Sequence, residues 1–247
     1  AKQKDRMIVF VGHGLVLLIF LSAIALVRLI QANTLSFVKE QMQNKVSYGK
    51  VVIESAFKSM TQSLESSANN PALISAMQKN QKDMITGVAR NIYEGNRNFR
   101  RILILNEIGD LMAIYPPLAM QTSNFSQGDY FKEVVKTKKT YISDLIPTTG
   151  SDSTNTIVLS TPIQVVATFS GVLVGSTDLD FLGVRLQQVA DASKQEYFTV
   201  ADRSGKRILH PTKSLINTDL VSDAPMREAL SGGKGVDIFD TSSAKVV

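Results

Sequence analysis

The stretch Arg101–Pro116, RILILNEIGDLMAIYP, decides the fold of this 247-residue chain. It holds two apolar runs of strand composition, Arg101–Asn106 and Leu111–Tyr115, separated by a polar turn that contains Gly109. This pattern is typical of a β-hairpin, because the apolar runs suit paired strands and a glycine allows the chain to reverse in a tight turn. The proline at residue 116 ends the second strand.

The same pattern returns in Tyr197–Pro211, YFTVADRSGKRILHP, again with a turn glycine, Gly205, and a closing proline. A fixed offset of 95 residues (226 − 131 = 95) continues the match and relates Phe131, Glu133 and Lys139 to Met226, Glu228 and Lys234. Such self-similarity indicates two copies of one supersecondary unit. The printed sequence ends after a third predicted strand near Val236–Phe239, so we expect the second copy to be incomplete.

Three more strands and a short helix are predicted between the two copies. The helix covers Asp129–Lys136, and the strands cover residues 140–146, 155–161 and 171–177, separated by turns rich in Gly and Ser. Together with the hairpin they give a mostly antiparallel five-strand pattern, with helices before and inside it. Leu179–Ala192 has apolar residues on one helical face and predicts a connector helix. The predicted fold class is therefore α+β.

A helical region precedes the hairpin. From residue 31, apolar residues recur at intervals of three to five with no proline before Pro71, which predicts one long helix ending near Asn69. Pro71 then suits the first turn of a second helix. Residues 31–98 are expected to form a helical spine on which the strands pack and through which the chain forms a homodimer. A coiled-coil stalk is the alternative role for the long helix.

The N-terminal region contains MIVFVGHGLVLLIFLSAIALV, residues 7–27, without a charged side chain. A helix needs about 20 apolar residues to cross the hydrocarbon core, so residues 7–30 are predicted as a transmembrane helix. A cleaved signal peptide is the alternative, but its apolar region is shorter and ends at small residues. Three basic residues before the span against Arg28 after it favour a cytoplasmic N-terminus, residues 1–6. We expect a single span in the inner membrane and an extracytoplasmic remainder.

The composition excludes most enzyme classes. The chain has no cysteine and only two histidines, His13 and His210, so a thiol nucleophile and a zinc–thiolate site are excluded and little remains for acid–base chemistry. We predict no catalytic residue, no metal site and no cofactor. Residues 1–30 carry +3 of the formal charge of +5 (four basic and one acidic), which leaves +2 elsewhere and gives no reason to expect a nucleic-acid partner.

The ordered motifs resemble a known family, the double Cache domain of bacterial transmembrane receptors, from about Asn33 to Val247. The residues that carry the resemblance are FRRILILNEIGD (99–110), SQGDYFKEV (126–134), YISD (141–144), IVLSTPI (157–163) and GVLVGSTDLD (171–180). No phrase is specific alone, but their order, spacing and repeat after a single span are. The resemblance implies two PAS-like antiparallel-sheet lobes carried by one long N-terminal helix.

The resemblance also implies an organisation and a function. Residues 99–178 would form the membrane-distal sensor lobe, residues 179–195 the connector, and residues 196–247 the membrane-proximal lobe, here incomplete. Such receptors bind a small molecule in the distal lobe and signal to a cytoplasmic output, which is a chemotaxis signalling domain, a histidine kinase or a diguanylate cyclase. The alternative function is a membrane-anchored envelope interaction protein that holds no small ligand.

Aromatic and acidic residues of the first lobe are the candidate ligand contacts: Tyr130, Phe131, Tyr141, Asp144 and Asp178. Aromatic rings can enclose an amine-bearing ligand, and a carboxylate can pair with an ammonium group. Each candidate has a structural alternative. The two adjacent aromatics would be core residues, Asp144 would belong to a turn, and Asp178 would cap the connector helix.

The ligand class follows from a departure from the family pattern. In amino-acid-binding members, an Arg-x-Trp-Tyr run grips the carboxylate, a later Tyr lines the pocket and an Asp takes the amine. Here Gly128 replaces the Arg, Tyr130 the Trp and Phe131 the Tyr, Ile146 stands at the later Tyr, and only Asp178 is retained. Without a guanidinium for a free α-carboxylate, we expect an amine or a hydroxyl-rich ligand.

Overall fold

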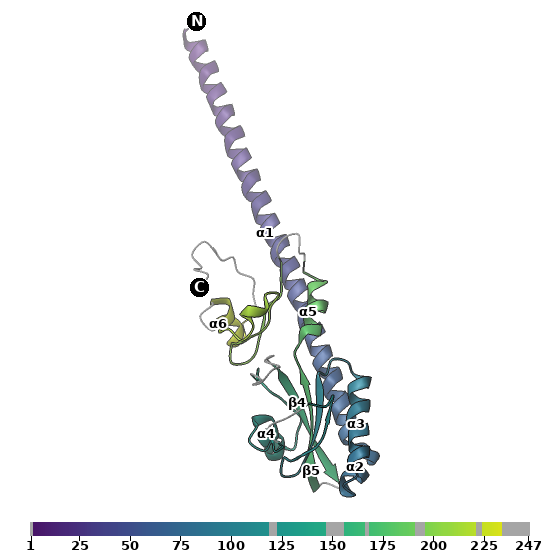
Figure 1. Ribbon diagram of the computed structural model, residues 1–247. Coiled ribbons are helices and arrows are strands. Elements are labelled where there is room, and N and C mark those ends of the chain that lie inside the picture. Colours follow the sequence, from purple (N-terminus) through teal and green to yellow (C-terminus); the bar gives the residue numbers. More distant parts are fainter. Residues whose placement is uncertain are drawn as a thin grey trace. The chain divides into compact units, whose positions relative to one another are not determined.

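The computed structural model describes residues 2–118, 123–146, 156–165, 168–190, 196–220 and 224–233. The chain divides into two compact units, one containing residues 1–48 and the other residues 49–234. Helix α1 (Lys2–Ala68) contributes residues to both units (Figure 1). The predicted strand near Val236–Phe239 lies outside the described residues.

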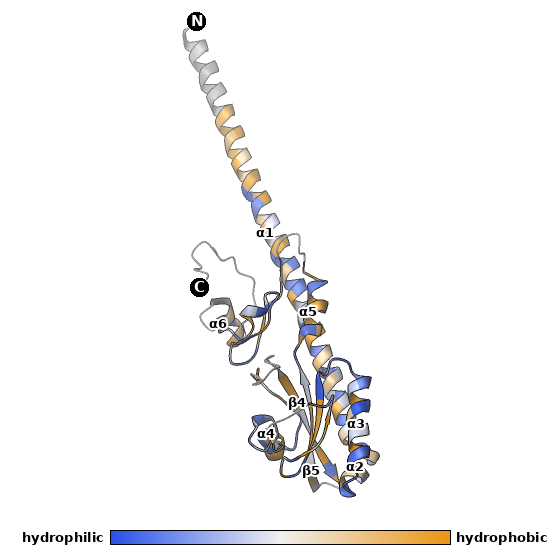
Figure 2. Ribbon diagram, in the orientation of Figure 1, coloured by the Kyte–Doolittle hydropathy of each residue, from blue (hydrophilic) through white to orange (hydrophobic). Residues whose placement is uncertain are grey.

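The first unit contains the apolar part of α1. Every side chain from Val16 to Ile30 is exposed, and most of them are large and hydrophobic (Figure 2). Among the described residues, one helix is long and apolar enough to cross a membrane, and this is its N-terminal portion. Exposed apolar surface of this extent is unfavourable in water and suits a lipid environment. By length and composition, this portion of α1 fits the predicted N-terminal span.

The C-terminal half of α1 packs on the second unit through one seam of side chains. Ala56, Met60, Leu64 and Ala68 follow one another at intervals of four residues and are buried, since residues four apart lie on one helical face. The helix ends where predicted. Asn70 accepts a hydrogen bond from the Ala72 amide at 2.8 Å, and proline is the first residue of α2 (Pro71–Gln78).

The helical region after α1 differs from the prediction of one further helix. It consists of α2 and α3 (Lys82–Gly95), separated by Asn80 in the left-handed conformation with φ 53°. Asparagine tolerates this conformation better than most residues, so the chain turns there and a second helix starts. The buried faces of both helices still contact the same core, through residues such as Leu73 and Ile85.

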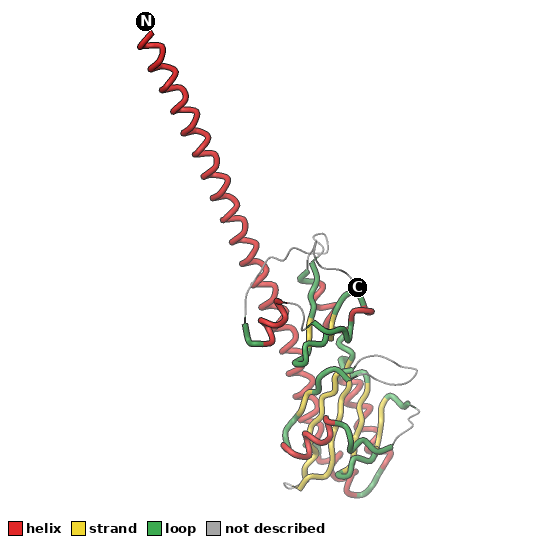
Figure 3. Tube along the Cα trace, turned by 90° about the vertical axis from the view of Figure 1, so that its left-hand side faces the viewer, coloured by secondary structure: helices red, strands yellow, loops and turns green. Residues whose placement is uncertain are grey.

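The predicted antiparallel sheet is confirmed and has five strands in the order β2-β1-β5-β4-β3 (Figure 3). The strands are β1 (Arg101–Asn106), β2 (Leu111–Tyr115), β3 (Tyr141–Ile142), β4 (Ile157–Val165) and β5 (Thr168–Thr177). Side chains alternate between two faces: Ile102, Ile104 and Leu173 pack under the helices of the spine, and Leu103, Val172 and Val174 pack under α4 (Asp129–Thr137). Figure 1 shows the sheet between α4 and the helices α1–α3.

The second copy of the hairpin follows the connector helix α5 (Asp180–Gln187). It comprises β6 (Val200–Ala201), β7 (Arg207–Leu209), the short 3₁₀ helix η2 (Lys213–Leu215) and α6 (Ala224–Leu230). Helix α6 starts 95 residues after α4 (224 − 129 = 95), the offset found in the sequence. The turn glycines of the two copies share a positive φ, 87° at Gly109 and 84° at Gly205. These glycines lie 96 residues apart, so the offset changes by one residue within the copy.

The seam of α1 generates the first prediction. Leu64 is fully buried, so replacing it by alanine leaves a cavity and is expected to lower the free energy of unfolding by about 2–5 kcal/mol. Val51 on the same helix is 60% exposed, and Val51→Ala is expected to change stability by less than about 0.5 kcal/mol. Urea unfolding of the full chain in detergent micelles measures both, and equal effects would show that the seam does not anchor the fold.

Candidate functional site

The sheet face under α4 is rich in aromatic side chains. Its buried residues are mainly aliphatic, and partly buried residues packed against them include Phe125, Tyr130, Tyr141 and Phe169. We call this surface the α4 face. Three of the five predicted ligand contacts, Tyr130, Phe131 and Tyr141, lie together on it. The opposite face packs against the spine through mostly aliphatic residues.

Tyr130 and Phe131 open helix α4 and have different environments. Phe131 is buried and meets the ring of Phe169 edge-on, with 6.5 Å between ring centroids, so it serves the core. Tyr130 is only partly buried, and burial raises the pKa of its phenol, which stays neutral near pH 7. Among the described residues, the Tyr130 hydroxyl has no hydrogen-bond partner. This hydroxyl is therefore available to a polar ligand or to water.

The position of the Tyr130 ring depends on the glycine before the helix. A Cβ atom on Gly128 would lie 2.6 Å from that ring, closer than real side chains approach. The tyrosine therefore occupies the space that any larger residue at position 128 would need.

Tyr141 lies beside Tyr130 through a shared neighbour on β4. Tyr141 pairs with Ser160 in the sheet, and the Ser160 hydroxyl donates a hydrogen bond to the Tyr130 carbonyl oxygen at 2.9 Å. The pKa of the Tyr141 phenol is raised, first by burial and then by the Asp144 carboxylate, while Arg203 opposes the shift. The α4 face thus offers two neutral phenols and aromatic rings. One of these rings, Phe169, already lies 3.9 Å from the Lys138 ammonium nitrogen.

Asp178 lies away from this aromatic group. It follows β5 and is four residues beyond Val174, which is opposite Ser160, so the strand places it about 13 Å along the sheet. One of its oxygens accepts a hydrogen bond from Arg100 at 3.4 Å, and the other accepts one from the Asp180 amide at 3.2 Å. The second contact is a local turn before α5 and not a helix cap, because the N-cap of α5 is Leu179 and makes no side-chain capping bond, so the capping alternative is wrong. The role of Asp178 as a ligand contact stays a prediction.

Asp144 turns towards the second copy of the hairpin. Its carboxylate accepts a hydrogen bond from the Arg203 guanidinium, with Nε at 3.2 Å from Oδ1. The two carboxylates predicted as ligand contacts therefore both pair with arginines. Asp144 lies close enough to Tyr141 to raise the pKa of its phenol, but the structure does not bring Asp178 together with the tyrosines.

A pocket of about 430 Å³ lies between α5 and the second hairpin, a place that the sequence did not indicate. Its walls are mainly apolar and include Leu186, Phe198 and Ile208, and charged residues such as Asp178 and Lys213 stand among them. His210, also in its lining, accepts a hydrogen bond from the Thr212 amide at 2.9 Å, and burial lowers the pKa of its ring. Across the described part of the chain, no three acidic or histidine side chains gather to bind a metal.

No protein-family model and no curated protein matches the chain. Several solved structures, however, are similar to it. An extracellular ligand-binding receptor from Desulfohalobium retbaense DSM5692 superposes with a TM-score of 0.61 at 15% identity, over 79% of this chain. This chain spans only about a third of that protein, 35% of its length.

Two further structures match over most of their own length. The ligand-binding domain of the Pseudomonas aeruginosa PAO1 amino acid chemoreceptor PctC, solved with GABA, gives a TM-score of 0.58 at 17% identity, over 81% of this chain and 85% of that one. The sensor domain of the Vibrio cholerae histidine kinase DctB gives 0.62 at 13%, over 77% and 73%. The chain therefore has the fold of extracytoplasmic sensor domains, which confirms the resemblance drawn from the sequence.

The contact between Gly128 and Tyr130 generates the second prediction. Gly128→Ala is expected to lower the free energy of unfolding by about 1–3 kcal/mol, because the new methyl group displaces the ring. In a Tyr130→Ala background the loss is expected to shrink by at least about 0.5 kcal/mol, since the obstacle is gone. The control is Gly95→Ala, where a Cβ meets no atom within 4 Å. Identical losses in both backgrounds, measured by urea unfolding, would refute the contact.

Proposed function

We propose that this chain is the extracytoplasmic sensing part of a bacterial transmembrane signalling receptor, and that it binds a small molecule at the α4 face of its first lobe. The observation that carries the proposal is the Tyr130 phenol, which is partly buried, neutral and without a hydrogen-bond partner among the described residues. Tyr141, on strand β3, packs against the same cluster. Ligand sites combine apolar walls with a few polar groups of this kind.

The fold supports the proposal. Similar domains have been solved with ligands bound, GABA in the chemoreceptor PctC and L-isoleucine in the Pseudomonas fluorescens chemoreceptor CtaA. PctC and CtaA are chemoreceptors, and DctB is a histidine kinase. A chemotaxis signalling domain or a kinase as the output domain is therefore consistent with this fold. The proposal that this chain binds a small molecule rests on both the fold and the α4 face.

The ligand we propose has no free carboxylate. Tyr130 fills the space in front of Gly128, so the α4 face offers phenols and aromatic rings where a guanidinium would be needed to hold a carboxylate. An amine or a polyol suits these groups, through cation–π contacts or hydrogen bonds. Asp178, about 13 Å along the sheet from the phenols, is proposed as a second contact point, separate from the aromatic group, for the ammonium of an amine ligand. Its ion pair with Arg100 is partly exposed and therefore weak enough for a ligand to replace the guanidinium.

The membrane arrangement completes the proposal. Residues 7–30 remain as an uncleaved span of the inner membrane, with residues 1–6 in the cytoplasm and the sensor lobes outside it. A second copy of the chain is the proposed partner of α1 beyond the span. Leu35, Val38 and Val46 support this role, because these exposed apolar side chains recur on one face of the helix.

The third prediction tests the ligand. Ethanolamine, tyramine and sorbitol are screened against L-isoleucine and GABA by thermal unfolding of the full chain in nanodiscs. At least one of the first three is expected to raise the Tm, since a compound at 100 times its Kd adds about 2.7 kcal/mol to the stability of the folded state. For an amine, Asp178→Ala is expected to abolish the shift. Asp180→Ala, which removes a neighbouring carboxylate paired with Lys213, is the matched control and should retain it.

Two outcomes would contradict this proposal. Shifts by the amino acids that persist in Asp178→Ala would show that both the ligand class and the role of Asp178 are wrong. No shift with any compound would favour the alternative function, an envelope interaction protein without a small ligand.

The fourth prediction tests the topology. A reporter enzyme that is active only outside the cytoplasm, fused after residue 60, is expected to be active, because the basic residues before the span retain the N-terminus inside. The same reporter fused before residue 7 should be inactive. Activity with the opposite pattern would overturn the proposed localisation.

A further inference from the structure

Strand β3 is an edge strand, and one side of it has no partner in its own sheet. On its inner side, Tyr141 and Ile142 pair with β4, and the Ser143 amide donates to the Val158 carbonyl oxygen at 2.9 Å. The Ile142 carbonyl, on the same peptide group as the Ser143 amide, points to the other side. Unpaired backbone groups on a sheet edge are a template for unwanted pairing, and proteins usually cover them.

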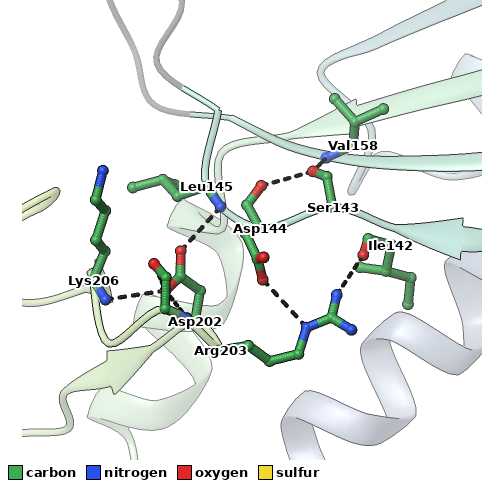
Figure 4. Close-up of polar contacts among 9 residues, drawn as sticks. Ile142, Ser143, Asp144, Leu145, Val158, Asp202, Arg203 and Lys206 are labelled. Carbon is green, nitrogen blue, oxygen red and sulfur yellow. Dashed lines mark hydrogen bonds and ion pairs between the residues drawn. The ribbon is translucent and has the colours of Figure 1, made fainter. Parts of the chain in front are cut away.

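Two residues of the second hairpin cover this edge. A terminal nitrogen of the Arg203 guanidinium donates to the Ile142 carbonyl oxygen at 2.8 Å, and its Nε donates to the Asp144 carboxylate at 3.2 Å. The Leu145 amide donates to Oδ2 of Asp202 at 3.1 Å. Figure 4 shows both side chains reaching residues 142–145 from the turn between β6 and β7. We call these contacts the edge clasp.

Comparison of the two copies of the hairpin shows which contacts of Asp202 belong to the turn. In the first copy, Oδ1 of Asn106 accepts hydrogen bonds from the amides of Ile108 and Asp110, at 3.1 and 2.8 Å, and so builds the turn. In the second copy, Oδ1 of Asp202 accepts from the amides of Ser204 and Lys206, at 2.9 and 3.0 Å. The turn therefore forms with an amide or with a carboxylate side chain.

Asn106 and Asp202 differ in the second terminal atom of the side chain, Nδ2 in asparagine and Oδ2 in aspartate. In asparagine that atom is a nitrogen, which only donates, and in Asn106 it faces the Asp110 carboxylate at 3.4 Å. In Asp202 it is an oxygen, which accepts from Leu145. The carboxylate is thus required by the edge clasp and not by the turn.

The charge of Asp202 is consistent with this role. Burial by itself would raise the pKa of its carboxyl group, but hydrogen bonds from Ser204, Leu145 and Lys206 together lower it. The carboxylate is therefore ionised near neutral pH and strengthens the hydrogen bond from the Leu145 amide.

We propose that Asp202 and Arg203 are positioning residues of the ligand site: by clasping the free edge of β3 they fix Tyr141, which precedes the clasped residues directly. The assignment of Tyr141 to the ligand site rests on the proposed function. The contact between the second hairpin and the sheet edge does not. Because one short segment joins the α4 face to the second hairpin, a change at either end shifts the other.

The isosteric change Asp202→Asn tests the edge clasp in the full chain in nanodiscs. The turn is retained, as Asn106 shows, but a donor now faces the Leu145 amide. Amide hydrogen exchange resolved to Leu145 is expected to accelerate at least tenfold, and Arg203→Ala is expected to accelerate residues 142–145 similarly. Lys206→Ala is the matched control, because only the backbone amide of Lys206 binds Asp202. The reciprocal change Asn106→Asp should leave Leu145 unaffected.

A conservative variant separates positioning from general loosening. Arg203→Lys keeps the charge opposite Asp144 but cannot reach two acceptors at once in the same planar geometry, so exchange at Leu145 should fall between wild type and Arg203→Ala. Unchanged exchange at Leu145 in both Asp202→Asn and Arg203→Ala would overturn the edge clasp.

The link to the ligand site needs a readout at the other end. Tyr141→Ala is expected to accelerate exchange at residues 204–206 in the wild type but to add nothing in the Arg203→Ala background. If Tyr141→Ala leaves the exchange rates at residues 204–206 unchanged, the positioning role is wrong. A failed ligand screen with these exchange results intact would instead count against the proposed function alone.

Discussion

The packing of one helical seam onto one sheet face is the constraint on which this structure depends. Ala56, Met60, Leu64 and Ala68 bring the end of α1 into the core that covers one face of the sheet. Helices α2 and α3 then complete the cover of the same face. The first face of the sheet is thus covered by three helices, whereas the opposite face is covered by α4 and carries a group of partly buried aromatic residues.

The two faces of the sheet differ in composition. The spine side is mostly aliphatic and fully buried at its centre, which stabilises the fold. The α4 face carries phenols whose burial keeps them neutral and whose rings remain partly accessible. Gly128 illustrates the difference. It is the N-cap residue of α4 but has no side chain to cap the helix, and the Tyr130 ring occupies the space that a side chain would need.

Features set by neighbours in sequence were predictable, and features set by distant residues were not. The hairpin at Gly109, the end of α1 at Asn70 and the repeat follow from local turn chemistry and periodicity. The break at Asn80 was missed, because a left-handed asparagine leaves little trace in a helical pattern. The partners of Asp178 and Asp144, Arg100 and Arg203, are 78 and 59 residues away, and only the folded sheet brings them together. Strand alternation places Tyr141 and Phe169 on the α4 face, whereas Tyr130 and Phe131 reach it from helix α4.

The edge clasp also bears on how the protein is made. Leu145 is synthesised 57 residues before Asp202, so the edge of β3 stays open for roughly 3–11 seconds at ordinary translation rates of about 5–20 residues per second. During that interval the nascent sheet offers a bare edge to any other unfinished chain nearby. A folding helper that shields strand edges, or slow delivery of chains to the membrane, would matter most in this window. The second hairpin thereby ends the period in which the newborn first lobe is most prone to aggregate.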